Sequence, residues 1–477
     1  MDYNIPLVDA LRKHISQKRI RFHMPGHKGG YHLTPRLLEL LGEKAFQADF
    51  TEVKGLDDLH NPQGVIAEAQ ELAARCFGAG ATFFLVNGAT CGIEAALLAT
   101  CKPGDVVIAP RNVHRSFLNG LILSGAEPVY IEVKYTAHGL PLPLQAAELK
   151  KALHAHPEAK AVFIVSPTYE GLAANYEQLM PVIKEAGVQL IVDEAHGAHF
   201  YFSRQFPKPA LPSGADIVIH GSHKMIGSLT QTGMLHLADS GAKESMQKAL
   251  SIVQSTSPSY LLMASLDGTR AQLALKGSEL FTKLIDLCQQ ARREINELSS
   301  FWCLTEKDLP ADIPYDPTKL VIGSLCGLSG YQLDAILSSY KLDMEMATLG
   351  YVLALTGIGD RQENLEYLVD VLKTIAKSGD LKHNQKRSIG RPYPPLPRAL
   401  LSPREAYFSP YVQVSLKEAK GKIAGEMIAP YPPGVPLICP GEVFTAEIIE
   451  YIEELRCQEI KWQGPADGSL QTVRIIE

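Results

Sequence analysis

Short apolar runs alternate with helical patterns through the middle of the chain, from about Ala81 to Thr230. The apolar runs fall at 81–86, 105–110, 127–133, 161–168, 190–196 and 216–224. Continuous apolar runs of this kind are typical of strands that are buried on both faces of a mostly parallel sheet. Helical patterns such as that at 175–187 separate the runs. The pattern therefore predicts an α/β fold with helices on both sides of the sheet.

The pattern changes after about Asp308. Apolar runs at 318–325 and 350–357 and helical patterns at 330–341 and 361–376 predict a smaller α+β unit. The stretch that follows predicts a stiff connector, because it contains Pro392, Pro394, Pro395, Pro397 and Pro403.

These changes in pattern suggest four parts of the chain. We expect an N-terminal segment, a large domain, a small α+β domain, and a proline-rich linker with a C-terminal domain, at 1–60, 61–307, 308–390 and 391–477. At 477 residues the chain is too long for one hydrophobic core, so more than one domain is expected.

The N-terminus has the pattern of a short amphipathic helix that docks on another element. Leu7, Leu11 and Ile15 recur at helical spacing. The segment lacks the cationic start and apolar run of a secretory signal. No run of about 18 apolar residues occurs, so the sequence predicts no transmembrane helix and no membrane partner.

Composition and charge narrow the class of protein. Hydrophobic residues make up 46% and charged residues 21%, as in a soluble enzyme, and the net charge of -6 argues against nucleic acid as a partner. The eight cysteines form no C-x-x-C pair. Without a secretory signal, we expect reduced thiols and a cytoplasmic protein.

A polar cluster follows the apolar run at 190–192, in the sequence DEAHGAH at 193–199. A nucleotide-hydrolysis box is excluded, because no Gly-Lys-Ser or Gly-Lys-Thr of a phosphate-binding loop occurs. A metal site formed by Asp193, His196 and His199 stays open, although the H-E-x-x-H order is missing. The third interpretation is a site for pyridoxal phosphate, which requires a lysine and an acid opposite the pyridine nitrogen.

The pyridoxal phosphate interpretation agrees with two further features. Lys224 follows the next apolar run, and side chains at the ends of neighbouring strands can face one ligand. The stretch 85–99 is a strand, a turn of small residues and a helix, which together offer backbone N–H groups to a phosphate. An aspartate and a lysine after strands also occur for purely structural reasons, so the residues alone leave the choice open.

The motifs are more specific. Across nearly its whole length the chain resembles the Orn/Lys/Arg decarboxylases, which are pyridoxal phosphate enzymes of the aspartate-aminotransferase-like fold. It is most similar to the compact arginine decarboxylases of Gram-positive bacteria. The matching stretches, in order, are 22–30, 56–74, 110–116, 166–171, 192–199, 223–231, 256–267 and 430–442. The resemblance makes 61–307 the large cofactor-binding domain.

The resemblance implies a role for each residue of the cofactor pocket. Lys224 resembles the Schiff-base lysine, and Asp193 resembles the acid that keeps the pyridine nitrogen protonated. His114 and Ala195 are expected to sandwich the cofactor ring. Ala89 and Thr90 match the turn that binds the phosphate.

Three further residues lie beside these. His223 is expected to serve either the phosphate or proton transfer. His196 is expected to take part in proton transfer, with a structural role as the alternative. The family usually has serine three residues before the lysine, where this chain has Gly221. Either Ser222 replaces that serine, or the backbone and Thr90 suffice.

The fold implies a homodimer or a higher homo-oligomer whose subunits share active sites. The segment 1–60 is expected to supply a dimer and active-site loop. Thr256, with Ser257, resembles a segment that reaches the phosphate bound by the neighbouring subunit. The substrate candidates are Glu52, Asp57, Asp58 and His27. Carboxylates suit a cationic side chain, but a solvated loop, or capping of the helix that begins near Gln63, explains the three acids equally well.

The implied reaction is α-decarboxylation of a basic L-amino acid, with arginine giving agmatine for polyamine biosynthesis. Lysine and ornithine are the alternative substrates, and we expect no metal. A transaminase would require an arginine for the α-carboxylate, and Arg361 is the one candidate in the small domain. A catalytically silent regulatory homologue is the alternative of another class. The segment 430–442 either packs near the active-site entrance or forms a rigid surface loop that exposes Cys439.

Overall fold

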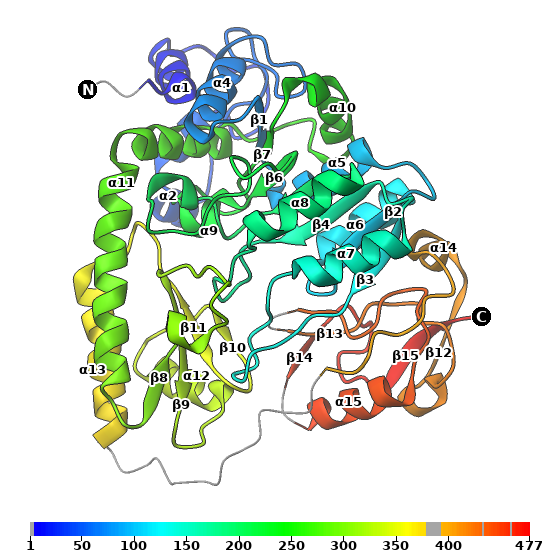
Figure 1. Ribbon diagram of the computed structural model, residues 1–477. Coiled ribbons are helices and arrows are strands. Elements are labelled where there is room, and N and C mark those ends of the chain that lie inside the picture. The colour runs from blue at the N-terminus through cyan, green and yellow to red at the C-terminus, as the bar shows by residue number, and fades with distance from the viewer. Residues whose placement is uncertain (1–3, 378–392, 432–433, 458–459) are drawn as a thin grey trace. The chain divides into compact units, whose positions relative to one another are not determined.

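The computed structural model describes residues 4–377, 393–431, 434–457 and 460–477 (Figure 1). The chain forms two compact units. The first takes in the chain up to Ala99 together with 191–204 and 208–281, and the second takes in 100–190, 205–207 and 282–477. No helix within the described residues has the length and apolar character needed to cross a membrane. The predicted division into four parts stays a prediction.

The strands of the large α/β region form one seven-stranded sheet. Its order is β1 (Ala81–Leu85), β7 (Gly233–Leu237), β6 (Ile217–His220), β5 (Gln189–Asp193), β4 (Ala161–Val165), β2 (Val106–Pro110) and β3 (Glu127–Ile131). The pairs β2–β3, β2–β4 and β5–β6 are parallel. The mostly parallel α/β sheet predicted from the apolar runs is therefore confirmed.

Strand β7 is the one strand of this sheet that the pattern did not predict. It pairs antiparallel with both β1 and β6. Its sequence, GMLHL, is fully buried, but His236 interrupts the apolar run. A polar residue in so short a run removes the signal on which the prediction depends.

The N-terminal helix docks within the first unit, as its pattern predicted. Helix α1 (Pro6–Ser16) packs on α4 (Val65–Phe77), which lies against β1 (Figure 1). Leu7 and Leu11 are buried, and the Leu7 N–H donates to Asp267 Oδ2 at 3.0 Å. The unit also contains α2 (Pro35–Leu41), α3 (Glu43–Ala48), α9 (Ser222–Met225) and α10 (Lys243–Val253), and most of α5 (Gly88–Thr100). Helix α11 (Tyr260–Asn296) begins in the first unit and ends in the second.

The second unit contains the predicted smaller α+β region. A four-stranded antiparallel sheet has the order β10 (Met346–Ala347), β11 (Val352–Leu355), β9 (Lys319–Ser324) and β8 (Phe301–Cys303). Helix α12 (Gly330–Ser339) packs on this sheet, and α13 (Gln362–Lys377) follows it along the chain. Helices α6 (Arg115–Ser124), α7 (Ala146–Ala155) and α8 (Tyr176–Ala186) also belong to this unit.

The C-terminal part of the second unit has its own hydrophobic core. Helix α15 (Ala446–Arg456) contributes Ile448, Ile452 and Leu455 to it. The surrounding elements are α14 (Pro403–Phe408), β12 (Tyr411–Ser415), β13 (Ala429–Tyr431), β14 (Lys461–Gln463) and β15 (Thr472–Ile476). The predicted linker prolines are described from Pro394 onward, whereas Pro392, Pro432 and Pro433 lie outside the described residues.

The described residues 434–442 of the proline-rich segment are anchored by a buried ion pair. Both guanidinium NH2 groups of Arg111 donate to Glu442, each at 2.6 Å, and Arg111 Nε donates to Pro436 O at 2.8 Å. Val435, Leu437 and Ile438 are buried as well. The surface-loop interpretation is therefore wrong for these residues.

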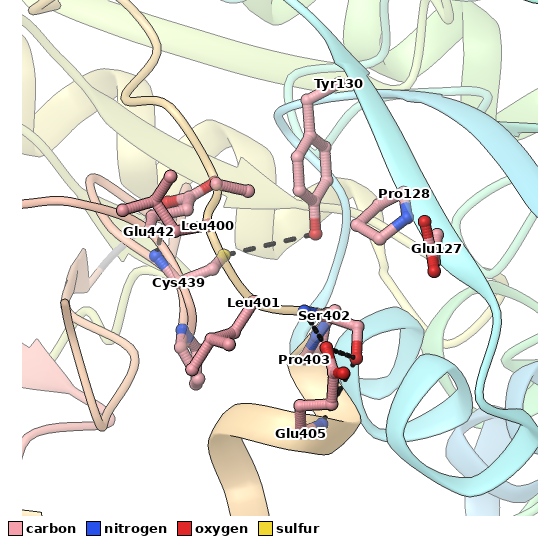
Figure 2. Close-up of a pocket in the computed structure, with 12 residues that line it drawn as sticks. Glu127, Pro128, Tyr130, Leu400, Leu401, Ser402, Pro403, Glu405, Cys439 and Glu442 are labelled. Carbon is pink, nitrogen blue, oxygen red and sulfur yellow. Dashed lines mark hydrogen bonds between the residues drawn. The ribbon is translucent and has the colours of Figure 1, made fainter. Parts of the chain in front are cut away.

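Cys439 is buried as well, which does not fit the surface-loop alternative. Its side chain lines a cavity of about 240 Å³, and its Sγ lies 4.0 Å from the hydroxyl of Tyr130 (Figure 2). Burial raises the pKa of this thiol to about 12. A thiol of this kind is protonated at neutral pH and chemically inert.

We expect Arg111→Met to destabilise the second unit by about 3–5 kcal/mol, because Glu442 would keep the hydrogen bond from the Cys439 N–H but lose the cation that balances its buried charge. Urea unfolding followed by intrinsic fluorescence measures the change. The control is Glu148→Gln, which breaks the exposed pair with Lys134 and is expected to cost about 1 kcal/mol or less. Equal effects of the two substitutions would contradict the anchoring role.

Candidate active site

Asp193 and Lys224 lie at the same edge of the sheet. Asp193 is the last residue of β5, and Lys224 lies in α9, directly after the neighbouring parallel strand β6. Lys224 Nζ is 3.0 Å from His196 Nε2, and Asp193 Oδ1 accepts a hydrogen bond from the Ala195 N–H at 3.1 Å. Four of the predicted residues thus come together at the carboxyl ends of two adjacent strands, where open α/β sheets bind ligands.

The electrostatics of Asp193 indicate that it faces a cation. Its side chain is 5% exposed, and this burial raises the pKa of the carboxyl group, while the charge of Lys224 and the Ala195 N–H lower it. A buried carboxylate keeps its charge when an opposite charge lies beside it. A protonated pyridine nitrogen is such a partner.

The predicted phosphate turn joins β1 to α5. Gly88, at the start of α5, has φ +77, a left-handed conformation that favours glycine. Ala89 and Thr90 follow in the first helical turn and are partly exposed. The first N–H groups of a helix have no partner within the helix, and they point toward an anion at this end.

Two glutamines hold this turn, and the sequence analysis missed both. Gln231 Nε2 donates to Val86 O at 2.8 Å, and Gln231 O accepts from the Gly88 N–H at 2.8 Å. Gln254 Oε1 accepts from the Val86 N–H at 2.9 Å. Gln231 lies inside a stretch that matched the family. No pattern in the sequence indicates, however, that its amide binds Val86, which is far away along the chain.

We expect Gln231→Asn to weaken cofactor binding about fivefold, because the shorter amide loses its hydrogen bond to Val86, worth about 1 kcal/mol. Asparagine tolerates the positive φ of 78 at this position. Titration of the apoprotein with pyridoxal phosphate, followed by absorbance, measures the affinity. Gln247→Asn is the control, since Gln247 holds the Leu59–His60 backbone instead. An unchanged affinity of the Gln231 variant would refute this role.

Ser222 fits the role of the missing family serine. Its hydroxyl is fully buried and has no hydrogen-bond partner among the residues that the structure describes. A Cβ added to Gly221 would lie 3.2 Å from Lys224 Cδ and 3.3 Å from Ala195 Cβ, so a serine there would crowd the lysine. A buried hydroxyl without a protein partner suits an acceptor such as a phosphate oxygen. The buried hydroxyl of Ser222, the carboxylate of Asp193 and the turn at Gly88 are the kinds of groups that bind pyridoxal phosphate.

His223 is held by the loop that follows it. Its Nδ1 is 2.8 Å from Thr232 O, so Nδ1 carries the proton and donates to that carbonyl. Its Nε2 is then an acceptor. This geometry allows a role in proton transfer, which stays a prediction.

Asp57 caps a helix, the alternative that the sequence left open. Its carboxylate accepts from the N–H groups of Gly64 and Ile66 at 2.8 and 3.0 Å, at the start of α4, and also from Gln63 and Ala67. Burial acts to raise the pKa of Asp57, but these N–H groups lower it overall. A carboxylate occupied in this way is a helix cap, and a role of Asp57 toward the substrate stays a prediction.

The other substrate candidates have looser surroundings. Glu52 Oε2 accepts from the Thr51 hydroxyl, while its Oε1 is buried without a partner. Asp58 is exposed and accepts from the His60 N–H at 2.8 Å. His27 pairs with Asp49 at 3.1 Å. Their roles toward a substrate stay predictions.

The two remaining residues predicted to bind the cofactor, His114 and Thr256, belong to different units. His114 belongs to the second unit, where it is exposed and caps α6, with Nδ1 2.7 Å from Ser116 Oγ. Thr256 and Ser257 are exposed in the first unit. The stacking role of His114 and the reach of Thr256 toward a neighbouring subunit stay predictions. Within the described residues, no group of three potential metal ligands occurs.

The geometry agrees with the comparisons to known proteins. The model of the Orn/Lys/Arg decarboxylase major domain matches residues 5–311, and that of the Orn/Lys/Arg decarboxylase C-terminal domain matches 386–465. An arginine decarboxylase of Bacillus subtilis (strain 168) is 37% identical over 100% of this chain and 98% of its own length. An arginine decarboxylase of Bacillus anthracis is 35% identical, with the same two shares.

A solved structure extends the likeness to the whole fold. The lysine decarboxylase LdcF of Francisella novicida superposes with a TM-score of 0.87 at 20% identity, covering 100% of this chain and 82% of that one. This chain therefore belongs to the Orn/Lys/Arg decarboxylase family. Membership confirms the aspartate-aminotransferase-like fold, the carboxy-lyase class and pyridoxal 5'-phosphate as the cofactor.

Proposed function

We propose that this chain removes the α-carboxyl group of L-arginine and releases agmatine and carbon dioxide. The observation that carries the proposal is the 37% identity to an arginine decarboxylase along the full length of both chains. The placement of Asp193, His196 and Lys224 at one edge of the sheet supports it. Lysine and ornithine are the alternative substrates. They have less support than arginine, because the relatives named lysine and ornithine decarboxylases are only 22–27% identical to this chain.

Different residues of the site bind different parts of the cofactor. Pyridoxal phosphate, when bound, supplies an electron sink for the charge left at Cα as carbon dioxide departs. Lys224 holds the cofactor, and Asp193 keeps a negative charge opposite the pyridine nitrogen. Ala89 and Thr90 offer N–H and hydroxyl groups to the phosphate, and Ser222 offers its buried hydroxyl.

Lys224 and His196 are the groups that move protons. Their nitrogen atoms are 3.0 Å apart, within the reach of a direct proton transfer. Either group can deliver the proton that replaces the lost carboxyl group at Cα. The other group can then return a proton to the one that donated.

The cationic end of the substrate requires a carboxylate. Glu52 suits this role because one of its carboxylate oxygens is buried and has no partner in the protein. A guanidinium group that donates to this oxygen would satisfy both. Asp58 is the second candidate, and His27 is a further residue of the same segment.

A homodimer with shared active sites is part of the proposal. Large apolar side chains of the segment 20–41 are exposed, including Phe22 at 94% and Leu40 at 78%. Helix α2 in this segment buries no residue. A second copy of the chain would cover these side chains and bring Thr256 to a neighbouring phosphate. We further propose a cytoplasmic enzyme of polyamine biosynthesis.

Transamination and a silent regulatory role have less support. Arg361, the candidate clamp for a retained carboxylate, is exposed directly before α13. The lysine and aspartate whose loss would favour a silent homologue are both present.

The test is the amine product profile. The purified holoenzyme is incubated separately with L-arginine, L-lysine and L-ornithine, and the amines are identified by mass spectrometry. Agmatine as the main product is expected. Cadaverine or putrescine as the main product would overturn the choice of arginine, and no amine from any substrate would overturn the decarboxylase function.

A further inference from the structure

A chain of buried polar side chains crosses four adjacent strands behind Asp193 and Lys224. Glu194 follows β5, and His220, His236 and Thr82 belong to β6, β7 and β1. Glu194 Oε2 is 2.9 Å from His220 Nε2, His220 Nδ1 is 3.0 Å from His236 Nε2, and His236 Nδ1 is 2.8 Å from Thr82 Oγ1. Glu194 and both histidines are fully buried. None of these groups has a part in the proposed reaction so far.

The chain of contacts is complete only when every hydrogen bond points the same way. If His220 Nε2–H donates to Glu194, then His220 Nδ1 must accept from His236, and His236 Nδ1 must accept from Thr82. Glu194 then accepts three hydrogen bonds as a carboxylate, with those from the Tyr201 hydroxyl at 3.0 Å and the Ala210 N–H at 2.8 Å. If Glu194 binds a proton instead, both imidazoles take the other tautomer and the direction reverses.

These hydrogen-bonded side chains link the two strands, β5 and β6, that precede the catalytic groups. Glu194 directly follows Asp193, and His220 precedes Lys224 by four residues. A backbone hydrogen bond also joins the ends of these two strands, because the Glu194 N–H donates to Ile219 O at 2.9 Å. Phe77 packs against both imidazoles, with ring centroids 5.2 Å from His220 and 4.7 Å from His236, and excludes water.

We propose that Glu194 and His220 are positioning residues, whose hydrogen bond fixes the ends of β5 and β6 and thereby the place of Asp193 relative to Lys224. The inference rests on the proposed function. Neither residue contacts the cofactor in this account. Each acts through its neighbour, since a displacement of about 1 Å between catalytic groups costs about 100-fold in rate.

The same network predicts how stability depends on pH. Burial raises the pKa of Glu194 to about 8, lowers that of His220 to about 3, and lowers that of His236. The groups that face Glu194 are His220, Tyr201 and His199. A raised carboxyl pKa gives stability that is lost as the pH rises through the folded value, whereas the lowered histidine pKa values give stability that is lost as the pH falls below 6.5.

Of Glu194, His220 and His236, only Glu194 changes its protonation in the folded protein above pH 6.5, so its contribution lowers the melting temperature of the holoenzyme between pH 6.5 and about 8. Glu194→Gln cannot ionise and is expected to show a smaller fall. Differential scanning fluorimetry at each pH measures both. Identical slopes for the two proteins would contradict this assignment of the titrating group.

The positioning role is tested on the holoenzyme with His220→Leu, His220→Gln and Glu194→Leu. Leucine at either position breaks the Glu194–His220 hydrogen bond, whereas glutamine at position 220 can donate to Glu194 and accept from His236. We expect His220→Leu and Glu194→Leu to weaken the visible circular dichroism of the bound cofactor and to lower kcat about 10–100-fold with little change in KM. His220→Gln is expected to restore most of both.

Thr82→Val is the matched control, because it changes the far end of the same chain and leaves the Glu194–His220 bond in place. Its kcat and circular dichroism are expected to be those of the wild type. The proposal is overturned if His220→Leu, or Glu194→Leu should that protein not fold, loses melting temperature but keeps the wild-type circular dichroism and kcat. A wild type that binds no cofactor and forms no amine would instead overturn the proposed function.

Discussion

Amine formation by Lys224→Ala is expected to fall by at least about 10⁴-fold relative to the wild type. The substitution removes the amine that holds the cofactor and also one of the two nitrogens that move protons, since Lys224 Nζ lies 3.0 Å from His196 Nε2. Alanine leaves the fold intact, because Lys224 is only partly buried. The lost side chain therefore affects the chemistry and not the stability.

The measurement is the rate of carbon dioxide release from arginine at saturating cofactor. Lys248→Ala is the control, because Lys248 is exposed on α10 in the same unit. A melting temperature within a few degrees of the wild type shows that the variant is folded. A Lys224→Ala protein with more than about one hundredth of wild-type activity would mean that another lysine carries the cofactor.

Asp193→Asn is expected to lower kcat about 10²–10³-fold, the range found when a single preorganised electrostatic partner is removed from an active site. Asparagine has the same shape and keeps the hydrogen bond that Asp193 Oδ1 accepts from the Ala195 N–H. It removes the negative charge, so the pyridine nitrogen loses its proton and the electron sink weakens. Cofactor affinity is expected to change less than kcat, because the phosphate contacts are untouched.

Asp267→Asn is the matched control for this second prediction. Asp267 is also a buried carboxylate of the first unit, but its partners are Arg270 and the Leu7 N–H. That variant is expected to lose stability and keep kcat. If both variants lost the same activity, the effect at Asp193 would reflect burial of the charge and not its place opposite the cofactor.

The residues that the sequence predicted well are those held by neighbouring backbone. Asp193, Ala195, His196 and Lys224 follow two strands whose apolar runs are unmistakable, and parallel strands bring their ends together. Gln231 and Gln254 were missed because their hydrogen bonds reach the turn at Val86 from far along the chain. No local pattern records such a contact.

The errors have a common physical origin in side chains whose partners are distant. Cys439 lies among prolines, a pattern that favours an exposed loop. Glu442, three residues further on, binds Arg111, and Cys439 is buried as a result. Strand β7 was hidden by His236, whose polar ring is satisfied by His220 and Thr82. Asp57 shows the opposite case, since its partners are only a few residues away and the sequence listed capping as an alternative.

The central claim is that Lys224 holds the cofactor opposite Asp193. Its most direct test is reduction of the holoenzyme with borohydride, which fixes the cofactor to its lysine, followed by peptide mapping by mass spectrometry. We predict that the added mass lies on the peptide that contains Lys224 and that the Lys224→Ala protein carries none. Added mass on any other lysine, or a wild type without added mass, would contradict the account.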